Sequence, residues 1–299
     1  MRIKGRQTAR SDGGHGHEHL RPAPQPRQGP GQQVVEGGGE VCLNTRVSAL
    51  LHDGNQIVGI RTVNAASGET QEHHGDYFIS TMPVKELVAA MEPPLPNEIN
   101  TIAEQLPYRD FLTVGLLVSR MKANIQSRSA QSNNMPPDNW IYIQEKDVRI
   151  GRLQIFNNWS PFLVADPDKI WLGLEYFCQE GDDLWTMSDE QMIRFAAEEL
   201  QKINMIDTAD VLDATVIRVP KAYPAYFGAY QQFPRLREYL DGFANLFLIG
   251  RNGMHRYNNQ DHSMLTARLA VECIHTGHTD KSDIWYVNID DDYHEEKKG

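Results

Sequence analysis

Alternation of apolar and polar residues marks the start of the patterned part of the sequence. Within Val41–Val47, apolar residues alternate with polar neighbours, which is the period of a half-buried strand. Asp53-Gly54 predicts a hairpin turn, and Ile57–Val63 predicts the returning strand. Further on, Tyr77–Ile79 predicts a short strand, and Pro83 suits the position just before a helix over Val84–Met91.

The middle of the chain predicts an antiparallel sheet with a few covering helices. Its strand candidates are rich in β-branched and aromatic residues. They are Leu112–Val118, Trp140–Ile143, Leu153–Phe156 and Ile170–Leu174. Ser188 followed by Gln191 three residues later is a capping box, and the apolar spacing after it predicts a helix with one buried face.

The last patterned unit combines a strand, a glycine, a polar loop and a helix. Leu246–Ile249 is an apolar strand that stops at Gly250, and a polar loop over Arg251–His262 follows. Apolar residues then recur at helical spacing over Ser263–Ile274. This order places backbone amides and a helix N-terminus against an anionic or carbonyl ligand.

Composition narrows the classes of function. The 299 residues carry a formal charge of −11, which disfavours a nucleic-acid partner. No window approaches ~20 continuous apolar residues, so no membrane span is expected. Three widely separated cysteines argue against a disulfide framework or a metal site and favour a cytoplasmic setting. Residues 1–38 predict a disordered leader, and residues 289–299 predict an acidic tail.

The polar loop after Gly250 holds the main candidates for binding a cofactor. A glycine directly after a buried strand lets a ligand approach the backbone, because no Cβ stands in the way. Donors and acceptors crowd the loop at Arg251, Asn252, Asn258, Asn259 and Asp261. An ordinary strand-to-helix connection, with Asp261 capping the helix, is the alternative interpretation.

The stretch LFLIGRNGMHRYNNQDHSMLTARLAVECI resembles the C-terminal flavin-binding motif of the FAD-dependent amine oxidase and protoporphyrinogen oxidase superfamily. Its glycine, arginine and tyrosine spacing is similar to that of UDP-galactopyranose mutases. The resemblance implies FAD as cofactor, with Gly250 and Arg251 beside the cofactor chain. It places Asp261, Ser263 and Met264 near the flavin ring, and Arg256 and Tyr257 at the substrate, with Tyr257 reaching nucleotide-sugar phosphates.

Two further stretches support this resemblance. The strand and hairpin from Val41 to the segment DYFISTMP are similar to the superfamily's corresponding region, which implies that Val47 lies near the adenine and Pro83 near the cofactor. In the segment before the last strand, Tyr223, Tyr226 and Tyr230 could line a substrate cavity, although aromatic residues at such spacing are more often part of a core. A plain hairpin followed by a strand is the alternative for the first stretch.

Glu175 is a weak catalytic candidate outside this region, for proton transfer, and Tyr257 is a weak catalytic candidate within it. A carboxylate in an otherwise apolar strand has a raised pKa if it is buried alone. The alternatives are a partner arginine or exposure on the open side of the sheet.

We expect an α/β fold, or α+β by strict count. A partial, Rossmann-like FAD-binding domain (39–92 plus 243–288) would be interrupted by an antiparallel-sheet substrate domain (93–242). The superfamily's G-x-G-x-x-G turn does not occur in the sequence, so we expect a truncated form. Three functions remain open: an FAD-dependent oxidoreductase acting on a small molecule, a mutase acting on a nucleotide sugar, and a non-catalytic fragment that needs a complementing chain. A homo-oligomer is also open.

Overall fold

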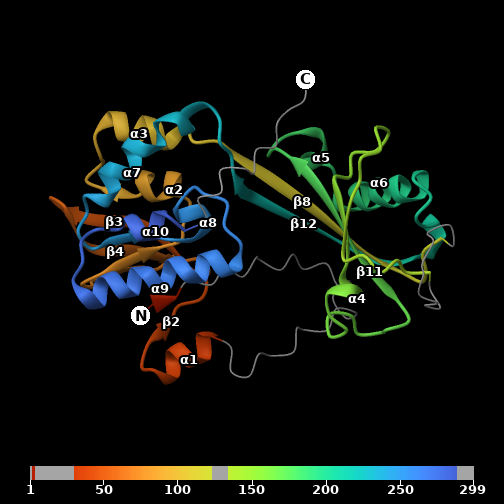
Figure 1. Ribbon diagram of the computed structural model, residues 1–299, viewed down its shortest axis with the longest axis horizontal. Coiled ribbons are helices and arrows are strands. Elements are labelled where there is room, and N and C mark those ends of the chain that lie inside the picture. Colours follow the sequence, from red (N-terminus) through yellow and green to blue (C-terminus); the bar gives the residue numbers. More distant parts are fainter. Residues whose placement is uncertain (1, 4–29, 123–133, 288–299) are drawn as a thin grey trace. The chain divides into compact units, whose positions relative to one another are not determined.

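The computed structural model describes residues 2–3, 30–122 and 134–287 and mixes helices with sheets (Figure 1). Contacts divide the chain into two units, which are described separately below. Unit 1 comprises Met1–Val41 and Arg109–Ala222, and unit 2 comprises Cys42–Tyr108 and Tyr223–Gly299. Most of the predicted leader, and all of the predicted acidic tail, lie outside the described residues. The domain boundaries expected from the sequence therefore stay a prediction.

Unit 2 contains the predicted hairpin. Strands β3 (Thr45–Asp53) and β4 (Gln56–Asn64) pair antiparallel, and Asp53 lies opposite Gln56 across the turn. Gly54 has a φ of 56°, a conformation that glycine adopts without steric cost. Two strands not expected from the sequence complete this four-stranded sheet: β5 (Thr70–His73) and β7 (Met91–Glu92).

Two parallel strands form a second sheet in unit 2. These are β6 (Phe78–Ser80) and β13 (Leu246–Leu248), with Phe247 opposite Ile79. The buried Asn245 side chain fixes this sheet to the hairpin. It accepts a hydrogen bond from the Ile57 N–H at 2.9 Å and donates to the carbonyls of Ile57 and Asp76 at 2.8 and 2.9 Å.

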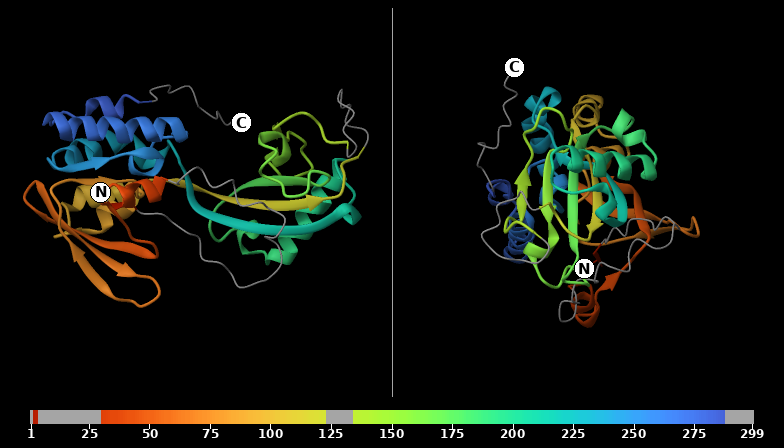
Figure 2. Two further views of the ribbon diagram at one scale, coloured as in Figure 1. Left: turned by 90° about the horizontal axis from the view of Figure 1, so that it is seen from below. Right: turned by 90° about the vertical axis from the view of Figure 1, so that its right-hand side faces the viewer.

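Helices pack around these strands. Figure 2 shows helix α9 on one side of the parallel strands and the hairpin on the other. The apolar core of the unit includes Leu50, Leu87, Leu236, Phe247 and Ala270, none more than 3% exposed. The helical segments of unit 2 are α2 (Val84–Ala89), α3 (Asn97–Glu104), the 3₁₀ helix η2 (Gly228–Gln232), α7 (Phe233–Asp241), α8 (Gly250–Gly253), α9 (Gln260–Thr276) and α10 (Ser282–Trp285).

Unit 1 contains the sheet predicted for the middle of the chain. Its strand order is β12-β8-β11-β10-β9, and the β8–β11, β11–β10 and β10–β9 pairs are antiparallel. The strands are β8 (Tyr108–Val118), β9 (Trp140–Tyr142), β10 (Arg152–Ile155), β11 (Ile170–Cys178) and β12 (Val211–Pro224). The chain passes between the two units along β8 and β12.

Helix α6 (Asp189–Lys202) packs its apolar face against this sheet. Leu172 and Leu174 share a core with Met192 and Leu200, and all four side chains are fully buried. The predicted capping box is confirmed, because the Ser188 hydroxyl accepts from the Gln191 N–H and the Gln191 side chain accepts from the Ser188 N–H. The remaining segments of unit 1 are β1 (Arg2–Ile3), α1 (Pro30–Glu36), β2 (Glu40–Val41), α4 (Phe156–Trp159), α5 (Asp183–Thr186) and η1 (Thr208–Asp210).

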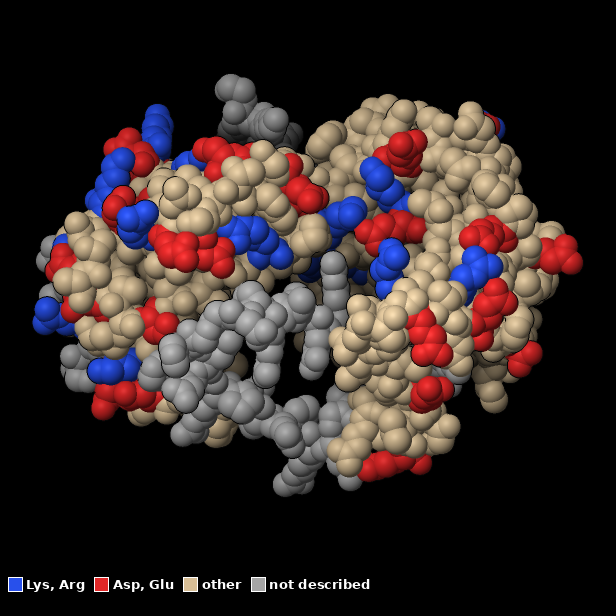
Figure 3. All heavy atoms as spheres, turned by 180° about the vertical axis from the view of Figure 1, so that it is seen from behind, with Lys and Arg blue, Asp and Glu red and all other residues tan. Residues whose placement is uncertain are grey.

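Helix α1 lies where the sequence predicts a disordered leader. Pro30 is its first residue, a position at which the missing N–H costs nothing, and no further glycine or proline occurs between Gly31 and Gly37. Within the described residues, no helix is both long and apolar enough to cross a bilayer. On the face drawn in Figure 3, basic and acidic side chains lie interspersed.

Candidate functional site

The carboxyl ends of the two parallel strands define the candidate site in unit 2. Leu248 of β13 lies opposite Ser80 of β6, and the Ile249 N–H donates to the Ser80 carbonyl at 3.0 Å. Both strands therefore end at the same edge, where Thr81 follows β6 and Ile249 and Gly250 follow β13. In sheets of parallel strands, ligands bind outside the carboxyl ends of the strands.

Two glycines let the loop after β13 pack tightly at this edge. Gly250 has a φ of 71°, and a Cβ built on it would lie 3.7 Å from the Ser263 Oγ and 4.0 Å from a Thr81 methyl carbon. A Cβ at Gly253 would lie 2.7 Å from the Ser80 carbonyl oxygen, closer than real Cβ atoms approach. The loop backbone, the end of β6 and helix α9 thus meet around these two glycines.

Helix α9 begins earlier than the sequence predicts. Asn259 is the residue before its first turn, and its N–H donates to the His262 Nδ1 at 3.2 Å. The alternative interpretation, in which Asp261 caps the helix, is wrong, because Asp261 lies inside the first turn with its side chain 78% exposed. Ser263 faces the Gly250 loop, whereas Met264 is 68% exposed.

The Arg251 guanidinium lies over two neighbouring tyrosine rings. Its guanidinium carbon lies 5.0 Å from the Tyr223 ring centroid and 4.7 Å from that of Tyr257, and the two rings are nearly parallel. The Arg251 Nε donates to the Asn258 carbonyl at 3.0 Å. Within the described part of the chain, the two terminal nitrogens of Arg251 have no hydrogen-bond partner. A fixed, half-buried guanidinium of this kind is suited to binding an anion.

The other tyrosines predicted for the substrate lie in the same cluster. The Tyr226 hydroxyl accepts a hydrogen bond from the Tyr257 N–H, and the Tyr226 and Tyr230 ring centroids are 4.9 Å apart. Arg256 is engaged elsewhere, because its Nη1 donates to the Trp285 carbonyl at 2.7 Å. The structure therefore brings Tyr223, Tyr226, Tyr230 and Tyr257 together with Arg251, and it directs Arg256 toward the C-terminal segment.

Two asparagines of the loop carry buried acceptor atoms without a donor. The Oδ1 atoms of Asn252 and Asn258 have no hydrogen-bond partner among the described residues. The Asn258 side chain is 2% exposed, so an unpaired oxygen there costs free energy unless a donor from outside the protein satisfies it. A ligand that brings hydroxyl or N–H groups would fit these atoms.

Val47 and Pro83, the other expected cofactor residues, lie on neighbouring elements of unit 2. Val47 pairs with Thr62 in the hairpin and packs against the core. Pro83 directly precedes α2, three residues after β6 ends. Pro83 therefore follows the same strand end as Thr81, whereas Val47 lies in the other sheet.

Glu175 belongs to unit 1 and has a partner arginine. Its carboxylate, 3% exposed, lies 3.0 Å from the Arg152 Nε across the β10–β11 pair, and its Oε1 accepts from the Gln154 side-chain amide. Burial raises the pKa of Glu175, while the Gln154 hydrogen bond and Arg152 oppose the shift. The Arg152 guanidinium also lies over the rings of Trp140 and Phe177, at 5.1 and 4.6 Å from their centroids. This arrangement matches the ion-pair alternative stated for Glu175.

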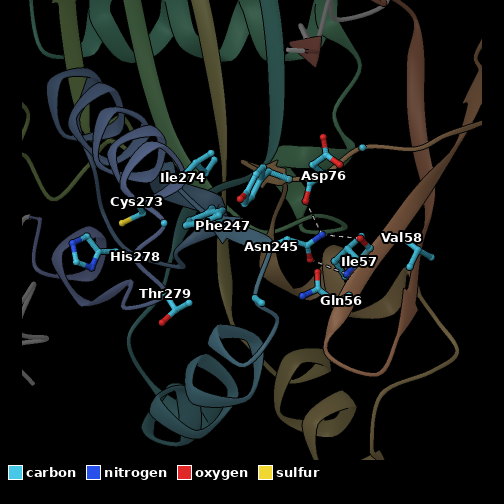
Figure 4. A pocket seen from close by; sticks show the side chains of 14 residues that line it. Gln56, Ile57, Val58, Asp76, Asn245, Phe247, Cys273, Ile274, His278 and Thr279 are labelled. Carbon is cyan, nitrogen blue, oxygen red and sulfur yellow. Dashed lines mark hydrogen bonds between the residues drawn. The ribbon is translucent and has the colours of Figure 1, made fainter.

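A cavity of about 680 Å³ lies at the opposite end of the parallel strands (Figure 4). Asp76, Asn245 and Phe247 line it at the start of β6 and β13, and Ile57 and Cys273 line it from β4 and α9. The cavity is therefore separate from the site around Gly250, which lies at the carboxyl ends of the same strands.

Sequence reasoning missed two residues of the site. The fully buried Thr266 accepts a hydrogen bond from the Gly250 N–H at 3.2 Å, and a polar residue on the apolar face of α9 was the available signal. His255 is also fully buried, and its Nε2 lies 3.2 Å from the Ala225 carbonyl. No pattern in the loop distinguished His255 from its polar neighbours.

The fold of this chain is shared with solved structures of enzymes. No family model matches the chain, and no curated protein matches it. A solved structure of reduced UDP-galactopyranose mutase is similar to it with a TM-score of 0.65 and 19% identity, covering 85% of this chain and 52% of the mutase. A protoporphyrinogen oxidase-like protein from an Exiguobacterium species is similar with a TM-score of 0.50 and 17% identity, covering 78% of this chain and 48% of that protein.

At these identities the likeness concerns the fold. It confirms the resemblance to the amine-oxidase-like superfamily at that level. The chain spans about half the length of the solved structures that it matches.

Proposed function

We propose that this chain forms the part of a flavin-dependent oxidoreductase that holds one end of FAD and the adjoining substrate. The observation that carries the proposal is the meeting of Gly250, Gly253 and the end of β6 beside the N-terminal turn of α9. The positive end of the helix favours an anionic or carbonyl-rich group at this position.

The residues at the strand ends fit part of the cofactor. The unpaired Oδ1 atoms of Asn252 and Asn258 would accept hydrogen bonds from its hydroxyl groups, and Arg251 would bind a phosphate or carboxylate. The tyrosines around Arg251 would exclude water from the space beside it. Bound flavin supplies the capacity to accept a hydride from the substrate. The sequence supplies no G-x-G-x-x-G turn for the pyrophosphate, so cofactor binding by this chain alone is the first property to test.

The absorbance of the purified chain tests this proposal directly. We expect a yellow preparation, or a colourless one whose unfolding temperature rises when FAD is added. Gly250→Val should abolish this effect, because a branched side chain is strained at a φ of 71° and fills the space beside Ser263. Gly75→Ala is the matched control, since its added Cβ meets nothing closer than 3.8 Å. A colourless chain that FAD does not stabilise would contradict the proposal.

A mutase acting on a nucleotide sugar is the second candidate. The position of Arg251 over Tyr223 and Tyr257 favours it, because a diphosphate needs a fixed cation and the neighbouring rings suit an organic ring. Incubation of the chain with FAD, dithionite and UDP-galactopyranose, scored for contraction of the sugar ring, tests this candidate. Arg251→Lys should lower the rate, because a lysine cannot make the same planar stack.

The third candidate is a chain that acts only with a complementing polypeptide. Within the described residues β13 and β6 pair only with each other, so neither outer edge of this parallel sheet has a neighbouring strand. Parallel sheets usually have more strands and are covered on both faces. Side chains near this sheet, including Val58 and Tyr77, are 44% and 50% exposed. Size-exclusion chromatography with light scattering tests whether the chain is a monomer or associates through such an edge.

A further inference from the structure

The buried His255 is the starting point of a further inference. Its ring is 0% exposed and lies among three aromatic rings, with centroid distances of 4.7 Å to Tyr108 and 5.7 Å to both Tyr230 and Phe233. A histidine in such surroundings is often only part of the core. The hydrogen bond that it forms suggests a more specific role.

The Nε2 of His255 lies 3.2 Å from the Ala225 carbonyl oxygen. Because a carbonyl can only accept, this nitrogen must carry the proton, and the ring is the neutral Nε2–H form with an unprotonated Nδ1. The Nδ1 has no hydrogen-bond partner among the described residues. The polar contact of His255 is therefore a single bond to the backbone of another segment.

That bond fixes the end of strand β12. Ala225 is 4% exposed; its N–H donates to the Pro107 carbonyl at 3.1 Å, and its carbonyl accepts from His255. Both backbone polar groups of Ala225 are thus held. A second link follows one residue further on, where the Tyr226 hydroxyl accepts from the Tyr257 N–H.

These two links join the segment 223–226 to the segment 255–257. The same segments carry Tyr223 and Tyr257, whose ring centroids are 5.9 Å apart with the Arg251 guanidinium over both. A shift of one segment along the other would separate the rings and release the guanidinium. The spacing of the stack therefore depends on how the two segments are joined.

We propose that His255 is a positioning residue: its Nε2–H bond to Ala225 sets the spacing of Tyr223 and Tyr257 and thereby holds Arg251 ready to bind an anion. The anion-binding role of Arg251 rests on the proposed function, whereas the geometry of the stack does not. His255 itself is not a catalytic residue in this scheme, because its ring is fully buried.

The proton on the imidazole ring provides a test that needs no variant. Nitrogen-15 chemical shifts of the histidine rings in the full chain distinguish the two neutral forms. We expect His255 to be the Nε2–H form between pH 6 and about pH 8. Finding the proton on Nδ1 would overturn the proposal, because the bond to Ala225 could not then form.

Two substitutions separate positioning from packing. His255→Gln can present an amide donor near the position of Nε2, whereas His255→Phe fills the aromatic surroundings without a donor. The readout is the Arg251 Nε–H proton resonance, which the rings of Tyr223 and Tyr257 beneath the guanidinium displace upfield. We expect His255→Phe to lose this displacement and His255→Gln to restore most of it. Phe243→Leu, a core substitution elsewhere in unit 2, is the control for lost stability and should leave the resonance in place.

Anion binding is measured separately, with inorganic pyrophosphate as the probe in isothermal titration calorimetry. We expect His255→Phe to weaken pyrophosphate binding at least fivefold and Arg251→Lys to weaken it at least as much. If His255→Phe folds and keeps both the Arg251 resonance and the affinity, His255 is only a core residue and the proposal is overturned. If neither the wild type nor any variant binds pyrophosphate, but His255→Phe still changes the Arg251 resonance, the anion-binding role of Arg251 is wrong and the positioning role of His255 stands.

Discussion

At the scale of single residues, close backbone contacts decide which positions of the site accept a side chain. Gly253 lies so close to the Ser80 carbonyl oxygen that even one methyl group on Gly253 would clash with it. We expect Gly253→Ala to lower the free energy of unfolding by about 1–3 kcal/mol, since overpacking forces the strand end and the loop apart. Urea unfolding measures this change. Gly75→Ala should stay within about 0.5 kcal/mol, and an equal loss in both variants would contradict the explanation.

The buried imidazole makes a prediction about pH. Burial lowers the pKa of His255 to about 4, from 6.5 for an unburied ring. Between these values the unfolded chain binds a proton that the folded chain does not, so stability falls as the pH is lowered from about 6.5 to 4. The full effect would be roughly 3 kcal/mol. The free energy of unfolding of the wild type and of His255→Gln, measured at pH 7 and pH 4.5, separates this contribution from that of the carboxyl groups. An equal loss of stability in both proteins would contradict the prediction.

Local sequence patterns predicted residues whose role depends on their own backbone conformation. Gly250 could be found because a glycine directly follows a run of four apolar residues. The hydrogen-bond partners of Thr266 and His255 could not be predicted, because they lie 16 and 30 residues away in the chain and meet them only in the folded unit. Capping by Asp261 was an alternative interpretation because the apolar spacing begins at Ser263, whereas the helix starts at Gln260.

At the scale of elements, the capping box at the start of helix α6 allows a quantitative prediction of stability. The Ser188 hydroxyl satisfies the Gln191 N–H, and the Gln191 side chain returns the bond. We expect Ser188→Ala to reduce the free energy of unfolding by about 1 kcal/mol, as at other N-caps. Glu198→Ala, an exposed change within the same helix, should alter it by less than about 0.5 kcal/mol. Denaturant unfolding of both variants checks this, and no difference between them would count against the cap.

Elements with a clear period were predicted, and those without one were not. The hairpin and α6 follow from alternation and from helical spacing, and both are confirmed. Strand β12 was missed because nearly all of its residues are only partly buried, so charged residues such as Arg218 and Lys221 interrupt the pattern. Helix α3 was missed because Pro93, Pro94 and Pro96 indicate a break, although Pro96 also suits the residue before a helix.

At the scale of the molecule, each unit has its own apolar core. Leu153 is fully buried in the core of unit 1, and Leu87 is fully buried in the core of unit 2. Truncating either side chain removes apolar contacts from one core only. Separate cores usually unfold as separate cooperative transitions unless a large apolar interface joins them.

We therefore expect two transitions in calorimetric unfolding, one for each unit. Leu153→Ala should lower the midpoint temperature of one transition, and Leu87→Ala that of the other. Each substitution should cost about 2–5 kcal/mol of unfolding free energy, which corresponds to a shift of several degrees. If FAD binds, it should raise only the transition that Leu87→Ala lowers, because the proposed site lies wholly in unit 2. A single transition that both substitutions shift equally would mean that the two units unfold together. The proposal that unit 2 binds FAD independently of unit 1 would then be contradicted.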